Sequence, residues 1–298
     1  MHIIVIGSVG NIGKQLTKKL VEKGHRVTGI DYKTESRKII TDLGAIPAIG
    51  DLNNVPFLNE SFEGADAVFT MYPPINYLEP DLDIVSHYKR LSENYAQAIS
   101  NAKVKRVVNL SSVGAHLASG NGVVKGAFYV EKILNALPPG ISVTHIRPNS
   151  LYTNLYGYMH TIKSEGKIYA SFGSKTMPWT SPIDLAAAVA EELSERHTTK
   201  AFRYMASDEL TGDEVAEIIG RAINMPHLKW QMISNEEAIH KFKSAGMRAA
   251  MAAEVAEMYA ALESGLMHED FEKNKPQQMG NVKFKDFAQE FAAAYKKY

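Results

Sequence analysis

Short runs of β-branched and aliphatic residues alternate with helical patterns through the first half of the chain. Six such runs precede residue 150, at residues 2–6, 26–30, 45–49, 67–70, 106–110 and 142–146. Most are continuously hydrophobic, which is typical of parallel strands covered by helices on both faces. The longest helical pattern between them spans residues 81–102. This alternation predicts an α/β fold, a doubly wound parallel sheet of the Rossmann type.

The sequence changes character after Pro148, which predicts a second, smaller and mainly helical domain. Tyr152, Tyr156 and Tyr158 lie close together there. A helix at residues 181–195 and a strand at residues 201–205 then return to the sheet. We therefore assign residues 1–152 and 181–206 to the sheet domain, and residues 153–180 and 207–298 to the smaller domain.

Charge and composition exclude several classes of function. The 33 Lys and Arg residues balance 33 Asp and Glu residues, so no positive field attracts nucleic acid or an anionic membrane. No apolar run reaches the length of a membrane helix, and we expect a cytoplasmic protein. The chain has no Cys, and its ten His residues show no ligand spacing, so we expect no metal.

A glycine-rich turn directly follows the first predicted strand. Gly7, Gly10 and Gly13 precede a helical pattern that begins at Lys14. The N–H groups of such a turn can approach a pyrophosphate, and the positive end of the helix adds to the attraction. A P-loop is excluded because five residues separate Gly7 from Gly13 and Gln15 replaces the magnesium-binding Ser or Thr. The pattern favours dinucleotide binding over an ordinary turn, with contacts at Gly7, Val9, Gly10, Asn11, Ile12 and Gly13.

Asp31 ends the second predicted strand, 18 residues after Gly13. A carboxylate at this position accepts hydrogen bonds from the adenosine ribose and repels a 2′-phosphate. It therefore favours NAD(H) over NADP(H), with Tyr32 as a neighbouring contact. The alternative is that Lys33, Arg37 and Lys38, which follow closely, neutralise a phosphate.

With its glycines spaced in this way, the sequence resembles the NmrA-like group of atypical short-chain dehydrogenases, which includes quinone and dye reductases. Further similar segments are residues 50–52, 63–69, 110–114, 146–154 and 181–186. The resemblance covers nearly the whole chain and implies an NAD(P)H cofactor in a Rossmann domain. Together with the positions of the strand ends, it indicates further cofactor contacts at Asp51, Leu52, Met71, Tyr72, Pro73, Ser111, Ser112, Pro148, Asn149 and Tyr152.

The sequence departs from the family of short-chain dehydrogenases at their Tyr-x-x-x-Lys pair, in which the lysine lowers the pKa of the tyrosine. Lys132 follows Tyr129 by three residues rather than four. If Glu131 is aligned with the family's recurring glutamate, the expected positions of the pair fall on Val123 and Ala127. Alcohol oxidation by the usual route is therefore disfavoured. Hydride transfer to a quinone or azo group needs less help, because such acceptors are already electrophilic.

Three residues are candidates for the catalytic proton donor. Lys125 and Tyr129 share one face of a predicted helix, although a solvated lysine above a packing tyrosine fits the same spacing. His116 precedes a segment at residues 119–122 that we expect to be mobile, and a simple loop histidine is the alternative. An apolar stripe with several methionines at residues 247–262 forms either a domain core or the wall of an acceptor pocket.

The sequence thus predicts an NAD(P)H-dependent oxidoreductase that passes hydride to a quinone-like or other conjugated apolar acceptor. The alternative is a catalytically silent dinucleotide sensor, as the resemblance to the NmrA regulator implies, acting through protein partners. A homodimer or a regulatory protein would be the macromolecular partner. Epimerisation of sugar nucleotides is disfavoured because the tyrosine base that it requires is missing.

Overall fold

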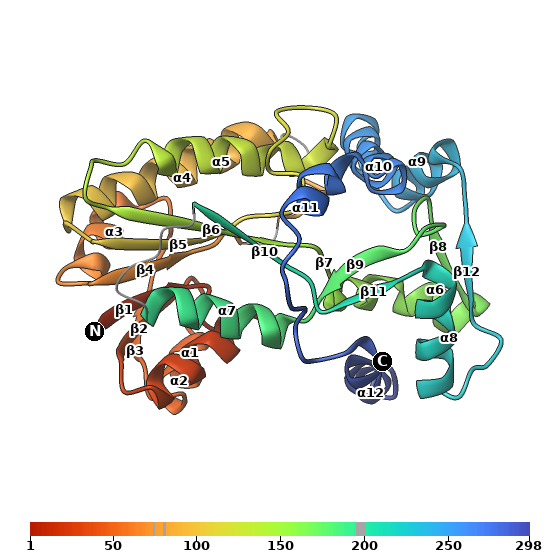
Figure 1. Cartoon of the computed structure of the whole chain (residues 1–298), viewed down its shortest axis with the longest axis horizontal. Helices are drawn as coiled ribbons and strands as arrows, with labels where there is room; N and C mark the ends of the chain where they lie inside the picture. The colour runs from red at the N-terminus through yellow and green to blue at the C-terminus, as the bar shows by residue number, and fades with distance from the viewer. Residues whose placement is uncertain (74, 80–81, 195–200) are drawn as a thin grey trace.

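A parallel sheet forms one half of the molecule in the computed structural model, which describes residues 1–73, 75–79, 82–194 and 201–298 (Figure 1). Its seven strands are ordered β10-β6-β5-β4-β1-β2-β3, and every neighbouring pair is parallel. They are β1 (His2–Ile6), β2 (Arg26–Asp31), β3 (Ile46–Ile49), β4 (Ala67–Thr70), β5 (Arg106–Leu110), β6 (Ser142–Pro148) and β10 (Phe202–Met205). The strand order reverses between β1 and β4. The predicted doubly wound fold is therefore confirmed, with its switch point at these two strands.

Helices cover both faces of this sheet (Figure 1). One layer contains α1 (Gly13–Glu22), α2 (Ser36–Asp42) and α7 (Pro182–Ser194), and the other contains α3 (Val55–Phe62), α4 (Ile84–Asn101) and α5 (Lys125–Asn135). Alternate residues of β1 pack against the two helix layers. Ile3 and Val5 pack toward the first layer, and Ile4 and Ile6 toward the second. This alternation explains why β1 is apolar throughout.

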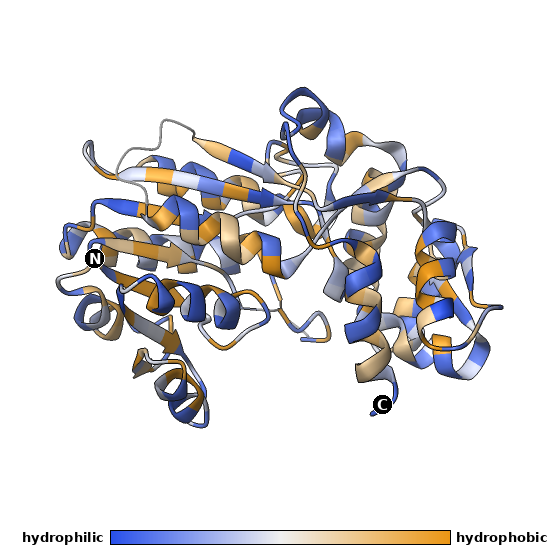
Figure 2. Ribbon diagram, turned by 60° about the horizontal axis from the view of Figure 1, so that its bottom comes forward, coloured by the Kyte–Doolittle hydropathy of each residue, from blue (hydrophilic) through white to orange (hydrophobic). Residues whose placement is uncertain are grey.

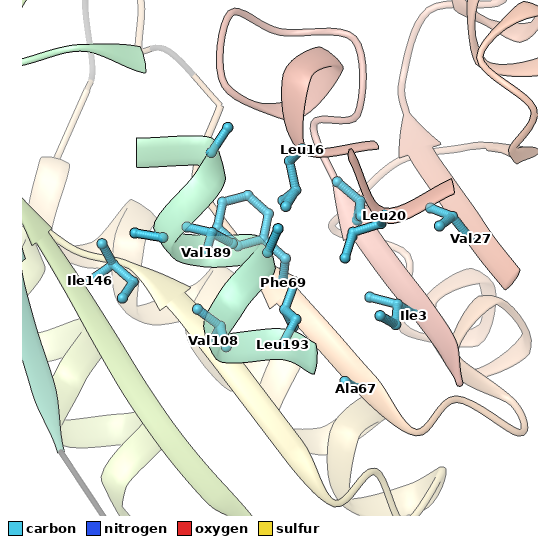
Figure 3. Packing of buried hydrophobic residues seen from close by; sticks show 14 of the residues in the cluster. Ile3, Leu16, Leu20, Val27, Ala67, Phe69, Val108, Ile146, Val189 and Leu193 are labelled. Atoms are coloured by element: carbon cyan, nitrogen blue, oxygen red, sulfur yellow. The ribbon is translucent and has the colours of Figure 1, made fainter. Parts of the chain in front are cut away.

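The core beneath α1 and α7 shows how the sheet is sealed on one side (Figure 3). Leu16 and Leu20 of α1 meet Val189 and Leu193 of α7 over Phe69 of β4. These side chains are almost completely buried. Each contributes roughly 1.5–3 kcal/mol through removal from water. Figure 2 shows the same arrangement across the fold, with hydrophobic residues along the central strands and hydrophilic residues on the outer sides of helices.

The other half of the molecule combines helices with short strands. Two small sheets are present, ordered β11-β9-β7 and β12-β8. Their strands are β7 (Ser150–Leu151), β8 (Lys167–Ala170), β9 (Met177–Thr180), β11 (Asp208–Leu210) and β12 (Lys229–Met232). The helices are α6 (Met159–Glu165), α8 (Gly212–Ala222), α9 (Asn235–Ser244), α10 (Ala249–Ser264), α11 (Glu269–Lys273) and α12 (Phe284–Tyr295), with 3₁₀ helices Gly122–Val124, Tyr152–Tyr158 and Leu266–His268. Strands of two to four residues show no periodicity, and the sequence did not reveal them.

Most differences from the predicted elements concern their ends. The sixth strand continues to Pro148, and β10 pairs with β6 at the sheet edge, as predicted for the returning strand. Helix α4 begins at Ile84 because Asp83 accepts the Ser86 N–H at 3.1 Å and caps the first turn. The predicted helix ends at Asp81 and Glu195 lie outside the described residues.

The burial of Phe69 in this core can be tested by a stability experiment. Phe69 is 1% exposed beneath both helices, so we expect Phe69→Ala to lower the free energy of unfolding by about 3–5 kcal/mol. Ile39→Ala is the matched control, because Ile39 is 41% exposed and its helix tolerates alanine. Urea unfolding followed by circular dichroism measures both. An equal loss in the two variants would contradict the assignment of this core.

Candidate functional site

The glycine turn after β1 closes tightly on itself. Gly7 has a φ of +69°, a conformation that favours glycine. A Cβ atom at Gly13 would lie 2.0 Å from the carbonyl oxygen of Gly7, and one at Gly7 would lie 2.6 Å from the Sδ atom of Met71. Backbone therefore packs against backbone at the start of α1, and Met71 covers the turn from the end of β4. Side chains at Gly7 or Gly13 would not fit.

No side chain caps the first turn of α1, although the Lys14 N–H donates to the Gly10 carbonyl oxygen at 2.9 Å. Its N-cap residue, Ile12, provides no side-chain hydrogen bond, and no acidic residue lies in the first turn. By contrast, Asn54 caps α3 and Thr211 caps α8 through side-chain oxygens. Free N–H groups at the positive end of a helix form an anion-binding site. A cavity of about 210 Å³ at this end is lined by Val9, Gly10, Asn11 and Tyr152, among others.

Two predicted acidic contacts follow β2 and β3. The Oδ1 atom of Asp31 accepts hydrogen bonds from the Lys33 N–H and the Ser36 hydroxyl, each at 3.0 Å. These bonds hold its carboxylate at the end of β2. Tyr32 is 62% exposed beside it. Asp51 accepts the Asn53 N–H at 2.9 Å, while the side chain of Leu52 is buried in the core.

Two hydroxyl groups of α4, those of Ser92 and Tyr95, anchor the segment after β4. The Tyr95 hydroxyl donates to the Met71 carbonyl oxygen at 3.1 Å. The hydroxyls of Tyr72 and Ser92 form a hydrogen bond of 2.8 Å. Burial raises the pKa of Tyr72, so this phenol remains neutral. Pro73 follows, partly exposed.

A larger cavity of about 460 Å³ opens at the carboxyl ends of β5 and β6. Ser111, Ser112, Pro148 and Asn149 line it from the sheet, as the Rossmann geometry requires of a ligand site. Its opposite walls consist of aromatic and aliphatic side chains, which include Tyr77, Leu155, Tyr158, Phe172, Trp179, Met258, Tyr259 and Leu262. No Asp, Glu, Lys, Arg or His is among its described lining residues. The cavity therefore suits a neutral, flat and largely apolar ligand.

A second cavity, of about 210 Å³, adjoins the first. Both are lined by Tyr77, Ser111, Ser112 and Met258, and the smaller one adds Tyr72. The structure thus brings the predicted contacts of β4, β5 and β6 to one edge of the sheet. Met258 comes from the methionine stripe, which contributes both to domain cores and to this wall.

Charged groups lie just behind the cavity and are paired there. The Ser111 hydroxyl donates to Glu131 Oε1 at 2.5 Å, and Arg147 donates to the two carboxylate oxygens of Glu131 at 2.9 and 2.6 Å. Arg147 also donates to Asp270 of α11 at 3.0 Å. Glu131 and Arg147 are 7% and 6% exposed. A buried bidentate pair of this kind fixes α5 against β6 and orients Ser111.

The three predicted proton donors lie away from the larger cavity. Lys125 forms a 2.5 Å ion pair with Glu254 of α10, and the Lys89 ammonium lies 4.2 Å from the centre of the Tyr129 ring. Neither nitrogen of His116 has a hydrogen-bond partner among the described residues, and burial lowers its pKa, which keeps it neutral. None of these three residues is among those that line the cavity.

Residues 119–122, which the sequence predicts to be mobile, are packed at their second half. Asn121 is fully buried, and its side-chain amide donates to the carbonyl oxygens of Gly114 and Leu117. A Cβ atom at Gly122 would lie 1.9 Å from the Glu254 carbonyl oxygen. Gly122 therefore permits close packing against α10.

Sequence reasoning missed the tyrosines as lining residues. Tyr158 belongs to the tyrosine cluster after β6, and Tyr259 to the apolar stripe of α10, so both patterns contained a signal. Tyr77 lies in a loop after β4, and no sequence pattern indicated that it would line a cavity. Within the described ranges, no three His, Asp or Glu side chains are grouped to hold a metal ion. No helix in the described part of the chain is both long and apolar enough to cross a bilayer.

The pair behind the cavity yields a stability experiment. We expect Glu131→Ala to lower the free energy of unfolding by about 3 kcal/mol, because Arg147 loses its bidentate partner in a buried site. The control is Glu191→Ala, which breaks an ion pair of a 52% exposed side chain with Arg203 and costs under about 1 kcal/mol. Equal costs in chemical denaturation would show that the buried pair is not structurally important.

Comparisons with known proteins show similar sequences and similar folds. Anthocyanidin reductase of Arabidopsis thaliana is 29% identical over 133 residues, which cover 40% of this chain and only 39% of that protein. The structure of an Escherichia coli NADPH-dependent quinone oxidoreductase complexed with NADPH matches with a TM-score of 0.80 at 17% identity, covering 97% of this chain and 99% of that chain.

Triphenylmethane reductase of Citrobacter sp., complexed with NADP(H), matches with a TM-score of 0.75 at 23% identity, covering 97% of this chain and 99% of that chain. At these identities the two structures demonstrate a shared fold. The family model of the NmrA-like family matches residues 1–292. The chain therefore belongs to the NmrA-like family, as the glycine spacing indicated.

Proposed function

We propose that the protein is an NAD(P)H-dependent oxidoreductase that passes hydride to a quinone-like or other conjugated apolar acceptor. The observation that carries this proposal is the pairing of two sites at one edge of the sheet. An uncapped glycine turn lies at the end of β1, and an uncharged cavity lies at the ends of β5 and β6. The first suits a diphosphate, and the second suits a flat, neutral molecule.

The residues present fit a dinucleotide. The turn from Gly7 to Gly13 leaves no room for side chains at its two end glycines and would hold the pyrophosphate against the start of α1. Asp31 would bind the adenosine ribose, and Ser111, Pro148 and Asn149 would surround the nicotinamide. The Escherichia coli and Citrobacter proteins with this fold, whose structures hold NADPH and NADP(H), support this class of cofactor.

The bound nicotinamide would supply a hydride, which carries two electrons and one hydrogen. The acceptor takes this hydride and one proton from solvent, so the products are the oxidised dinucleotide and the dihydro acceptor. The chain would contribute orientation and an apolar surface that displaces water from the acceptor, since Phe172, Trp179 and Leu262 line the cavity. An electrophilic acceptor needs no strong acid, which accords with the missing Tyr-x-x-x-Lys pair.

The proposal divides the work between the two domains predicted from the sequence. Residues 1–152 and 181–206 would bind the dinucleotide, and residues 153–180 and 207–298 would supply about half of the residues that line the acceptor cavity. A sensor without catalytic activity differs from this proposal in one measurable way. It would bind the dinucleotide tightly and reduce no member of a panel of quinones and azo dyes.

The glycine turn supplies the test of cofactor binding. We expect Gly13→Ala to weaken NADH and NADPH binding at least tenfold, because the new methyl group collides with the Gly7 carbonyl oxygen. Gly157→Ala is the matched control, since no atom lies within 4 Å of its added Cβ. Nicotinamide fluorescence titration measures the affinities, and thermal unfolding checks that both variants fold. Unchanged affinity in folded Gly13→Ala would remove the turn as the diphosphate site.

The carboxylate of Asp31 supplies a separate test of cofactor preference. We expect the wild type to bind NADH more tightly than NADPH, because a 2′-phosphate would approach this carboxylate. Asp31→Asn removes the charge and should bring the two affinities closer by about fivefold to tenfold. A wild-type preference for NADPH would mean that Lys33 and Arg37, both exposed, decide the preference instead.

A further inference from the structure

Three tyrosines from distant parts of the chain line the larger cavity. Tyr77 follows β4, Tyr158 ends the 3₁₀ helix Tyr152–Tyr158, and Tyr259 lies in α10. Each ring is partly open to the cavity and otherwise surrounded by protein. The proposed hydride transfer uses none of their hydroxyl groups. They bring polar hydroxyls to a wall that is mostly apolar.

Two of these phenols lie next to each other. Tyr158 and Tyr259 each influence the pKa of the other. Two neighbouring phenols can satisfy at most one of their two O–H donors between themselves, so at least one O–H is left over. Neither hydroxyl donates to any other group within the described residues. An apolar ligand that displaces water from the cavity would leave this donor without an acceptor, whereas a ligand oxygen would satisfy it.

The surrounding rings fix the direction of this donor. The Tyr259 ring lies 4.8 Å from the centre of Phe172 and 6.0 Å from that of Phe242. The Tyr158 ring lies 6.2 Å from that of Trp230. Side chains held in this way lose little freedom when a ligand arrives. The donor is therefore preorganised.

The tyrosines remain protonated at neutral pH. Burial raises the pKa of Tyr77, Tyr158 and Tyr259, and the nearby Tyr259 raises that of Tyr77 further. They act as donors of hydrogen bonds and not as anions. An aromatic wall can also hold a cation over its ring faces, but that arrangement leaves the spare O–H without an acceptor.

We propose that the Tyr158–Tyr259 pair, with Tyr77 beside it, binds the carbonyl oxygen of a neutral flat acceptor and selects quinone-like molecules over cationic dyes. This inference rests on the proposed function for its meaning, because it names the class of acceptor. The binding step that it describes can be measured without the dinucleotide and without turnover.

Isothermal titration calorimetry with 1,4-naphthoquinone, naphthalene and crystal violet tests this subsite on the full chain. The chain has no Cys, so quinones cannot form thiol adducts. We expect the wild type to bind the quinone about tenfold more tightly than naphthalene and more tightly than the cationic dye. The quinone affinity should not change between pH 6 and 9, because the phenols stay protonated. Equal affinity for quinone and naphthalene, or tighter binding of crystal violet, would overturn the proposal.

The variants locate the donor. Tyr158→Phe/Tyr259→Phe should weaken quinone binding about fivefold to tenfold and leave naphthalene binding unchanged. Tyr158→Phe alone leaves one O–H and should change quinone binding less than twofold. Tyr169→Phe, which removes an exposed phenol bonded to Glu165, is the control. Unchanged quinone affinity in the double variant overturns the assignment of the donor, and if that variant fails to fold, the wild-type comparison still decides.

The two proposals fail in different ways. Selective quinone binding without any oxidation of NADH or NADPH would refute the reductase and leave the oxygen-binding subsite in place. Turnover of quinones combined with unchanged quinone affinity in the double variant would refute the subsite and leave the reductase.

Discussion

The contact between the Gly7 carbonyl and Gly13 is the constraint on which the architecture of the site depends. It lets α1 start directly after the end of β1, with no side chain capping its first turn. Met71 then packs over Gly7 from the neighbouring strand and contacts the cores on both faces of the sheet. Met71 thus fills the space between β1 and β4, where the strand order reverses. A ligand bound at the switch point would contact backbone atoms and Met71.

The order of the strands then decides which distant residues meet. Because β4, β5 and β6 are parallel neighbours, the segments that leave their carboxyl ends emerge side by side. Tyr77, Ser111 and Asn149 come together for this reason, although more than 70 residues separate the first from the last. The second half of the chain supplies the remaining wall through α10 and the 3₁₀ helix Tyr152–Tyr158. The strand order therefore determines where the cavity lies, and the side chains that line it determine its chemical character.

The sequence predicted the sheet well because buried parallel strands carry a strong local signal. The runs at His2–Ile6 and Ala67–Thr70 were identified to the residue, and the glycine turn was placed correctly. The tyrosine wall was not found, because the positions of Tyr77 and Tyr259 depend on contacts between segments about 180 residues apart. For Lys125, the local pattern was correct but the contacts of the side chain were not predicted. Its helical spacing with Tyr129 was real, but Glu254 of α10 holds its ammonium group, and no local pattern contains that ion pair.

The neutrality of the cavity depends on the charges behind it. Ser111 lines the cavity and donates a hydrogen bond to Glu131, so the pair of Glu131 and Arg147 lies close behind the lining. An unpaired charge at that depth would attract water and polar ligands, since desolvation of a lone ion costs several kcal/mol. The bidentate pair, completed by Asp270, gives both buried charges partners behind the lining. The Ser111 hydroxyl donates its proton to Glu131 and can only accept a hydrogen bond from a ligand, whereas the tyrosine hydroxyls of the cavity can donate one.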